Sequence, residues 1–99
     1  MVDYRVSKAA QKDIREIGLY TQREWGAAQR RKYLSSMEQQ FDNIAQSPFL
    51  AAEYKEFMPP VRILPHKKHL IVYLVEDGGV LIIRILHASM DIPAQLSDQ

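Results

Sequence analysis

Three basic side chains lie in the apolar C-terminal half of the sequence, where charge is unusual. Arg62 and Arg84 fall inside stretches of β-like composition, and His87 ends the second stretch. Charged groups inside strands are costly unless they are paired or reach the surface. One interpretation is that each arginine lies at a strand edge and forms an ion pair with a carboxylate. The other is a cationic sheet face that holds a phosphate or a partner's carboxylate through parallel hydrogen bonds.

His87 and Asp91 are a second candidate pair. An imidazole ordinarily titrates near neutral pH, so His87 could act as a general acid or base, although a histidine at a strand end is more often a structural residue. Asp91 would either orient His87 or cap a short helix that begins at Ile92 and Pro93. The following proline favours the cap. In a regular strand Arg84 and His87 lie on opposite faces, unless a bulge intervenes.

Other kinds of site find little support. His66 and His69 have metal-like spacing, and His87 could complete a trio, but no nearby carboxylate has matching spacing, so we expect no metal. The absence of cysteine excludes disulfides and thiolate sites. The cluster Arg30-Arg31-Lys32 is typical of a solvated helix face. There is no glycine-rich phosphate loop and no G-x-S-x-G motif, so no cofactor is expected.

Composition indicates a small globular protein. The chain has 99 residues, of which 46% are hydrophobic and 25% charged, and its formal net charge is +1. We expect a single domain spanning residues 1–99. Basic and acidic residues nearly balance in both halves, which argues against a general nucleic-acid-binding protein. The N-terminus lacks an apolar signal-like segment, and no apolar stretch is long enough to span a bilayer, so we expect a cytoplasmic protein.

The N-terminal half predicts two helices. After a short extended stretch at Tyr4-Arg5-Val6, Ser7 suits a helix N-cap. Apolar residues then recur at spacings of three and four, which indicates one buried stripe, formed by Ala10, Ile14, Ile17, Thr21 and Trp25. Gly26 ends this helix, and a second helical pattern runs to Ser47-Pro48. So short a link predicts an antiparallel hairpin of helices.

The C-terminal half predicts strands. They are Val61–Leu64, stopped by Pro65, then 70–75 and 80–86, with a hairpin turn at Asp77-Gly78-Gly79. A tail from Ile92 to Leu96 could form a helical turn. The predicted fold is therefore α+β in the order β-α-α-β-β-β, with a helical hairpin on a small, mostly antiparallel sheet.

The two long strands are apolar on both faces, and the hairpin can cover only one. The second face needs cover from the connector at residues 48–60, from the tail, or from a partner chain.

The chain resembles the ParE family of the ParE/RelE toxin superfamily over about residues 3–96. The matching segments are Ala9–Ile17 with Tyr20, Trp25-Gly26, Ser47-Pro48, Val61-Arg62, His69–Tyr73, and Arg84–His87 with Met90-Asp91. The resemblance implies the β-α-α-β-β-β fold and a bacterial toxin neutralised by a ParD-like antitoxin. It also implies inhibition of DNA gyrase without enzymatic activity of its own.

The resemblance also implies binding surfaces. Target contacts are expected from the residues of the C-terminal motif and one further arginine, namely Arg62, Arg84, His87 and Asp91. An amphipathic antitoxin segment is expected on the second sheet face and the connector, at Leu70, Val72, Leu74, Tyr54 and Phe57. We expect neither membrane association nor sequence-specific binding to nucleic acid.

Two alternatives remain at this stage. The RelE branch shares the fold but cleaves mRNA on the ribosome, and Arg62, Arg84 and His87 would then be the catalytic set. The near-neutral composition disfavours that chemistry, which needs charge stabilisation around a phosphate. An inactive protein that keeps the toxin fold and binds a partner is the other alternative.

Overall fold

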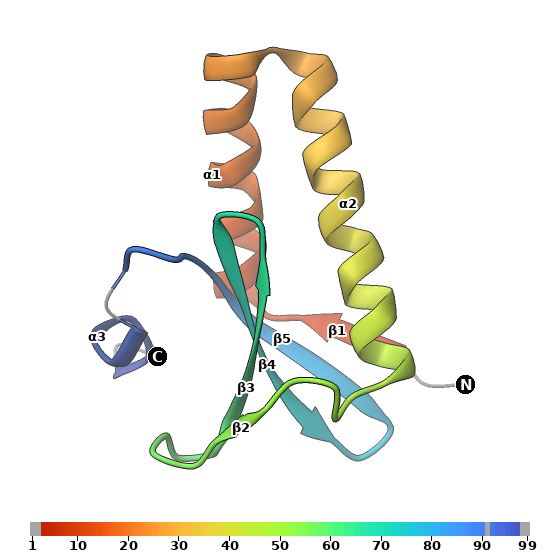
Figure 1. Ribbon diagram of the computed structural model, residues 1–99, viewed down its shortest axis with the longest axis vertical. Helices are drawn as coiled ribbons and strands as arrows, with labels where there is room; N and C mark the ends of the chain where they lie inside the picture. Colours follow the sequence, from red (N-terminus) through yellow and green to blue (C-terminus); the bar gives the residue numbers. More distant parts are fainter. Residues whose placement is uncertain (1–2, 91, 98–99) are drawn as a thin grey trace.

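The computed structural model describes residues 3–90 and 92–97. Its elements follow the predicted order, with one added strand in the connector and a short helix at the end (Figure 1). They are β1 (Asp3–Val6), α1 (Lys8–Trp25), α2 (Ala27–Gln46), β2 (Glu53–Tyr54), β3 (Val61–His66), β4 (His69–Glu76), β5 (Gly79–His87) and α3 (Ile92–Ser97). The α+β prediction is confirmed. No helix in the described ranges is long and apolar enough to cross a membrane.

The five strands form one sheet in the order β1-β5-β4-β3-β2. Only the β1–β5 pair is parallel, and the other three pairs are antiparallel. Two-residue turns join the long strands, namely Lys67-Lys68 between β3 and β4, and Asp77-Gly78 between β4 and β5. Gly78 has a φ of 83°, which explains the glycine at this predicted turn.

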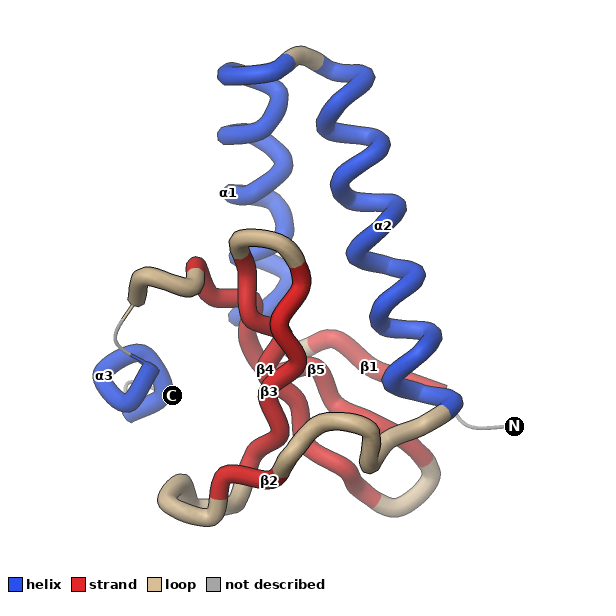
Figure 2. The backbone as a smooth tube through the Cα atoms, viewed as in Figure 1, coloured by secondary structure: helices blue, strands red, loops and turns tan. Residues whose placement is uncertain are grey.

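The two helices lie together on one side of the sheet and project past its end (Figure 2). Ser7 begins α1 as predicted, because its hydroxyl accepts a hydrogen bond from the Ala10 N–H at 3.0 Å. The same hydroxyl donates to the Ile83 carbonyl at 2.8 Å. One side chain therefore both caps the first helix and fixes it to β5.

Two apolar clusters lie on the two faces of the sheet. The inner cluster packs between helices and sheet and includes Ala10, Met37, Phe41, Ile44, Ile71, Tyr73, Val80, Ile82 and Ile85. The outer cluster has a fully or nearly buried centre formed by Val61, Ile63, Val72 and Leu86. Phe57 of the connector and Ile92 and Leu96 of α3 pack against it. The chain itself therefore supplies cover for the second face, through both the connector and the tail.

Three sequence expectations need correction. β3 continues through Pro65 to His66, because β2 pairs only with Val61 and Arg62 and the rest of β3 is an edge, where a proline is tolerated. The connector contains β2, whose two residues were too few to give a pattern. Trp25 ends the predicted buried stripe but is 70% exposed, because α1 extends beyond the sheet.

A bulge interrupts the pairing of β4 with β5. Val72 lies opposite Arg84, whereas the next residue, Tyr73, lies opposite Ile82, so Ile83 is an extra residue in β5. The bulge precedes Arg84, and the side chains after it again alternate between the two faces of the sheet. Consistent with this, Ile85 belongs to the inner cluster and Leu86 to the outer cluster.

Candidate functional site

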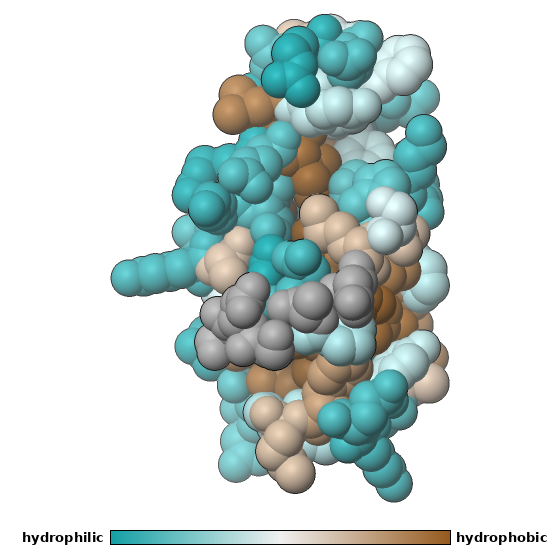
Figure 3. Space-filling model, turned by 90° about the vertical axis from the view of Figure 1, so that its left-hand side faces the viewer, coloured by the Kyte–Doolittle hydropathy of each residue, from teal (hydrophilic) through white to brown (hydrophobic). Residues whose placement is uncertain are grey.

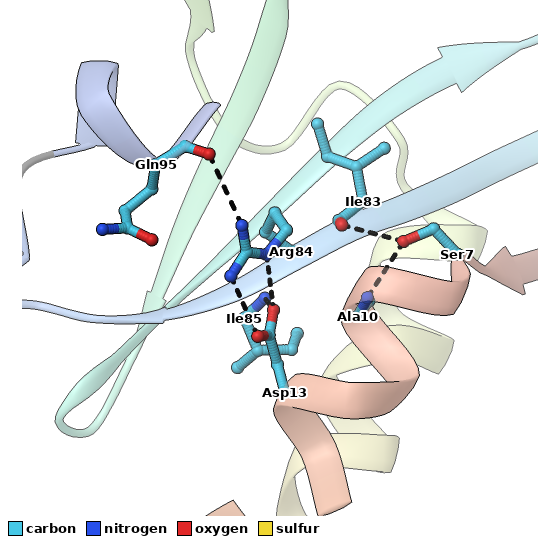
Figure 4. A network of polar contacts seen from close by, with 7 residues as sticks. All are labelled: Ser7, Ala10, Asp13, Ile83, Arg84, Ile85 and Gln95. Atoms are coloured by element: carbon cyan, nitrogen blue, oxygen red, sulfur yellow. Dashed lines mark hydrogen bonds and ion pairs between the residues drawn. The ribbon is translucent and has the colours of Figure 1, made fainter. Parts of the chain in front are cut away.

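Arg84 forms an ion pair with Asp13 of α1 (Figure 4). Its Nε and Nη2 atoms donate to the two carboxylate oxygens at 2.8 and 3.0 Å. Its Nη1 lies 3.5 Å from the Gln95 carbonyl oxygen of α3. The two charged side chains are only 15% and 11% exposed. The ion-pair interpretation is confirmed for Arg84, whose contact with a target protein stays a prediction.

This ion pair lies where β5 loses its neighbour in the sheet. β1 pairs with β5 only as far as Ile82, so the next backbone groups of β5 need other partners. The Asp13 carboxylate accepts the Ile85 N–H at 2.9 Å, while Ser7 occupies the Ile83 carbonyl. Side chains from the start of α1 therefore close the open edge of β5, and Arg84 extends the connection to α3 (Figure 4).

Arg62 serves a different part of the fold. Its Nη1 donates to the Ala51 carbonyl at 2.6 Å, and its guanidinium lies over the Phe49 ring, 5.0 Å from the centroid. Beside it, the hydroxyl of buried Tyr73 donates to the Pro48 carbonyl at 2.8 Å. Burial raises the pKa of Tyr73, against smaller opposing effects of a backbone hydrogen bond and the Arg62 charge. Arg62 and Tyr73 thus hold the start of the connector against the sheet.

His87 is exposed at the end of β5. Its Nδ1 accepts the Ser89 N–H at 3.2 Å and lies 2.7 Å from the Ser89 hydroxyl. An accepting Nδ1 leaves the proton of the neutral ring on Nε2. The ring also meets His69 edge to face, with the centroids 5.5 Å apart. Asp91, the other predicted contact in this region, lies outside the described residues.

A cluster of imidazole and hydroxyl groups surrounds the β3–β4 turn. His69 Nδ1 is hydrogen-bonded to the Tyr33 hydroxyl, and His66 Nε2 lies 3.1 Å from the Ser36 hydroxyl. Burial lowers the pKa of His69, and the neighbouring His87 and His66 lower it further, with Asp13 opposing. Burial and Lys67 lower the pKa of His66. Within the described residues, no group of three or more histidine or acidic side chains is arranged to hold a metal ion.

A groove of about 1030 Å³ lies between the helical hairpin and this turn. Aromatic side chains form the helical wall, namely Tyr20, Trp25 and Tyr33. The turn and the first residue of β4 contribute basic groups to the opposite wall, namely Lys67, Lys68 and His69. His87 and Met90 lie at the end where β5 leaves the sheet. The groove combines exposed aromatic surface with charge.

Comparison with known proteins assigns the family. Residues 4–92 match the model of the ParE toxin of type II toxin–antitoxin systems, parDE. The chain is 34% identical to Toxin ParE of Escherichia coli, across 100% of this chain and 97% of that protein. It is 32% identical to Toxin ParE1 of Mycobacterium tuberculosis, across 94% of this chain and 96% of that protein. The chain belongs to the ParE toxin family.

A solved structure supports the fold of this ParE-family chain independently. A chain from the chromosomal ParDE toxin–antitoxin system of P. aeruginosa superposes with a TM-score of 0.75. The alignment covers 88% of this chain and 96% of that one, at 19% sequence identity. At that identity the likeness shows a shared fold and nothing about individual residues.

The predicted target-binding residues of this ParE-family toxin do not form one cluster among the described residues. Arg62 holds the connector, Arg84 joins α1 to β5 and α3, and only His87 is exposed in the groove. These contacts link Arg62 and Arg84 to separate parts of the fold. The three residues of the alternative catalytic set therefore do not form one cluster.

The predicted antitoxin-binding residues differ in accessibility. Tyr54 is 39% exposed, while Leu70, Leu74 and Phe57 are half-buried around the outer cluster. Val72 is fully buried, so the expectation that it contacts an antitoxin does not fit this structure. Alternation along the strand could not distinguish a face open to a partner from one already covered by the chain's own tail.

Sequence reasoning missed the groove. Tyr20 entered only as part of the resemblance, and Trp25 was placed on a buried stripe. Helix length gave no signal, because the 18 residues of α1 span roughly 27 Å at 1.5 Å per residue and the 9 residues of β5 span about 30 Å at 3.3 Å per residue. The projection of α1 past the sheet depends instead on the angle and offset at which the helical hairpin packs, and no local sequence pattern contains these.

Proposed function

We propose that this ParE-family toxin inhibits DNA gyrase in the bacterial cytoplasm and is neutralised by a ParD-like antitoxin. The observation that carries the proposal is the match to ParE toxins over nearly the whole chain. The proposal includes the absence of catalysis by the toxin itself: it would act by binding gyrase so that cleaved DNA accumulates. The engagement of Arg62 and Arg84 in structural contacts supports this view.

Ribosome-dependent mRNA cleavage is the competing activity, and one observation favours it. The groove places Lys67, Lys68, His69 and His87 along one side, and these groups could contact a phosphate and move a proton. Against it, the acidic residue Glu16 lines the same groove, and Arg84, a member of the alternative catalytic set, is already paired with Asp13. We therefore favour gyrase as the target.

Two assays on one preparation separate the activities. The first measures DNA supercoiling by purified gyrase and the linear DNA released when the protein is denatured. The second measures cleavage of an mRNA on purified 70S ribosomes. The proposal expects lost supercoiling and accumulated linear DNA, with intact mRNA. Cleaved mRNA with unaffected gyrase would establish the competing activity, and no effect in either assay would indicate an inactive fold.

A further inference from the structure

The groove between the helical hairpin and the β3–β4 turn brings two kinds of surface face to face. The hairpin projects past the sheet (Figure 2), so the inner sides of the last turns of α1 and the first turns of α2 have no strand beneath them. On the other side of the sheet, α3 and the connector pack on the outer cluster, and Figure 3 shows apolar surface beside the C-terminal segment. The groove differs from this apolar face because it pairs aromatic with basic side chains.

The helical wall offers flat aromatic rings to the solvent. Trp25 is 70% exposed and Tyr20 is 55% exposed. A nucleobase stacks on the face of such a ring, and one stacked base changes affinity roughly fivefold to a hundredfold. Gln29 of α2 is exposed beside these rings, and its amide can both donate to and accept from the edge of a base. This wall therefore suits a planar heteroaromatic ring with a polar edge.

The opposite wall offers hydrogen-bond donors to an oxyanion. Lys67 and Lys68 are exposed on the turn, and the Lys67 ammonium lies 5.2 Å from the centroid of the Tyr33 ring, so this charge lies against the aromatic wall. Each ammonium carries three donors. His87 adds a donor, because its Nδ1 accepts the Ser89 N–H and the proton of the neutral ring lies on Nε2. Phosphate oxygens are the natural ligands of such a set.

Two carboxylates in the groove restrict the ligand to a short one. Arg84 binds both oxygens of Asp13, which compensates that charge, whereas Glu16 is exposed on α1. A nucleic-acid strand carries a phosphate at every nucleotide, so its passage along the groove would bring negative charge to Glu16. A single nucleotide can place its phosphates at the turn and present only sugar hydroxyls to Glu16. A carboxylate accepts hydrogen bonds from ribose hydroxyls in other nucleotide sites.

The size of the groove fits the same ligand. Its volume is about 1030 Å³, and small-molecule sites typically enclose about 300–1,000 Å³. This volume has room for a base, a sugar and a chain of phosphates. A nucleotide also carries its aromatic part and its charged part at opposite ends, as the two walls require.

We infer that this groove binds a nucleoside polyphosphate. The base stacks on Tyr20 and Trp25, the sugar hydroxyls face Glu16, and the phosphates contact Lys67 and Lys68. The inference goes beyond the proposed function, because it requires neither gyrase nor an antitoxin. It assigns to the toxin a small-molecule ligand in addition to its protein partners.

Trp25 makes the inference directly measurable. It is the only tryptophan of the chain, so the fluorescence of the purified full-length toxin reports on the groove. ATP, added in the presence of magnesium chloride, should quench this emission saturably, because its base stacks on the indole. Calorimetric titration of the same solutions gives the Kd. A Kd for ATP weaker than about 1 mM would overturn the inference.

Two partial ligands test whether both walls take part. Adenosine keeps the base and the sugar, and inorganic tripolyphosphate keeps only the phosphates. Each should bind at least about tenfold more weakly than ATP, because each loses the contacts of one wall. Tripolyphosphate that binds as tightly as ATP would show an unspecific cationic patch and would also overturn the inference.

Substitutions then locate the site by calorimetric titration with ATP. Tyr20→Ala should raise the Kd roughly tenfold through the lost stacking. Lys68→Glu should raise it about tenfold and weaken the dependence on salt. Leu19→Ala and Lys55→Glu are the matched controls, because Leu19 and Lys55 are exposed but do not line the groove, and their Kd should stay within about twofold. Equal affinity of all four variants would exclude the groove.

One further arm distinguishes a nucleotide from a nucleic acid. A short single-stranded RNA is titrated into wild-type toxin at physiological salt, and repulsion by Glu16 should make its Kd higher than that of ATP. Tighter binding of the RNA, lost in Lys68→Glu, would assign the groove to nucleic acid and overturn the inference. These titrations contain the toxin without gyrase, so their outcome is independent of the proposed function.

Discussion

The pairing of Arg84 with Asp13 makes one arginine responsible for the connection of three elements. A buried charge that loses its partner pays a desolvation cost that no remaining contact offsets. Asp13 keeps its bond to the Ile85 N–H when Arg84 is absent, but its charge is then left nearly buried. The pairing with Asp13 is therefore a sufficient reason for an arginine at position 84, without any contact to a target protein.

Arg84→Ala should therefore lower the free energy of unfolding by about 3–5 kcal/mol. Chemical denaturation measures this change, and Arg5→Ala is the control because Arg5 forms an exposed pair with Glu76, which should be worth less than about 1 kcal/mol. Asp13→Ala alone and the double variant complete a thermodynamic cycle. Equal stability of the Arg84 and Arg5 variants would show that the buried pair contributes nothing. Loss of gyrase inhibition by a stably folded Arg84→Ala would restore Arg84 as a target contact.

His69 gives stability a pH dependence with a defined sign. Its pKa is lowered in the folded protein, mainly by burial, so the unfolded chain binds a proton at a higher pH than the folded chain. Stability should then decline as the pH falls from about 7 through the unfolded value near 6.5, and level off below the folded pKa. His69→Asn should flatten this decline in a series of denaturation curves. An NMR titration that places the His69 midpoint at or above 6.5 would contradict the account.

At the scale of elements, the parallel contact of β1 with β5 depends on a glycine. Gly79 pairs with Asp3 and has a φ of 155°, and a Cβ built on it would lie only 2.3 Å from the Asp3 carbonyl oxygen. Gly78 also has a positive φ, but its Cβ would meet open space. A substitution at Gly78 therefore tests backbone strain alone, whereas a substitution at Gly79 adds a clash with β1.

Gly78→Ala should cost about 1 kcal/mol, because an alanine at positive φ is strained. Gly79→Ala should cost more, about 2–4 kcal/mol, because β1 must also move away from β5. Thermal and chemical unfolding of the two variants measures the difference. Hydrogen exchange at the β1 amides should rise only in Gly79→Ala. Identical stability of both variants would mean that β1 contributes little to the fold.

Local signals account for the elements that the sequence predicts well. Ser7 caps α1 and Asp77-Gly78 turns the β4–β5 hairpin, and both follow from the residues beside them. Residues outside the segment itself decide what was missed. The partner of Arg84 is 71 positions away, and β2 depends on pairing with the next strand, β3, rather than on a pattern in its own two residues. Periodicity along one segment carries no information about such pairings.

For the whole molecule, the sequence did not indicate which apolar surfaces the chain covers with its own segments. The tail and connector cover the outer face of the sheet, which leaves Val72 buried, whereas Tyr20 and Trp25 on α1 stay mostly exposed. Both outcomes depend on the lengths and angles of packed elements. The surface that the sequence assigned to a partner is therefore partly occupied, and Trp25, which the sequence assigned to the buried stripe, is exposed.

Reversal of gyrase inhibition by the antitoxin tests the central claim most directly. Gyrase supercoiling and linear DNA are measured while purified toxin is titrated, first alone and then after mixing with equimolar antitoxin. The account predicts that toxin alone abolishes supercoiling and accumulates linear DNA, and that the antitoxin restores the activity of gyrase. Normal supercoiling at saturating concentrations of folded toxin would contradict it.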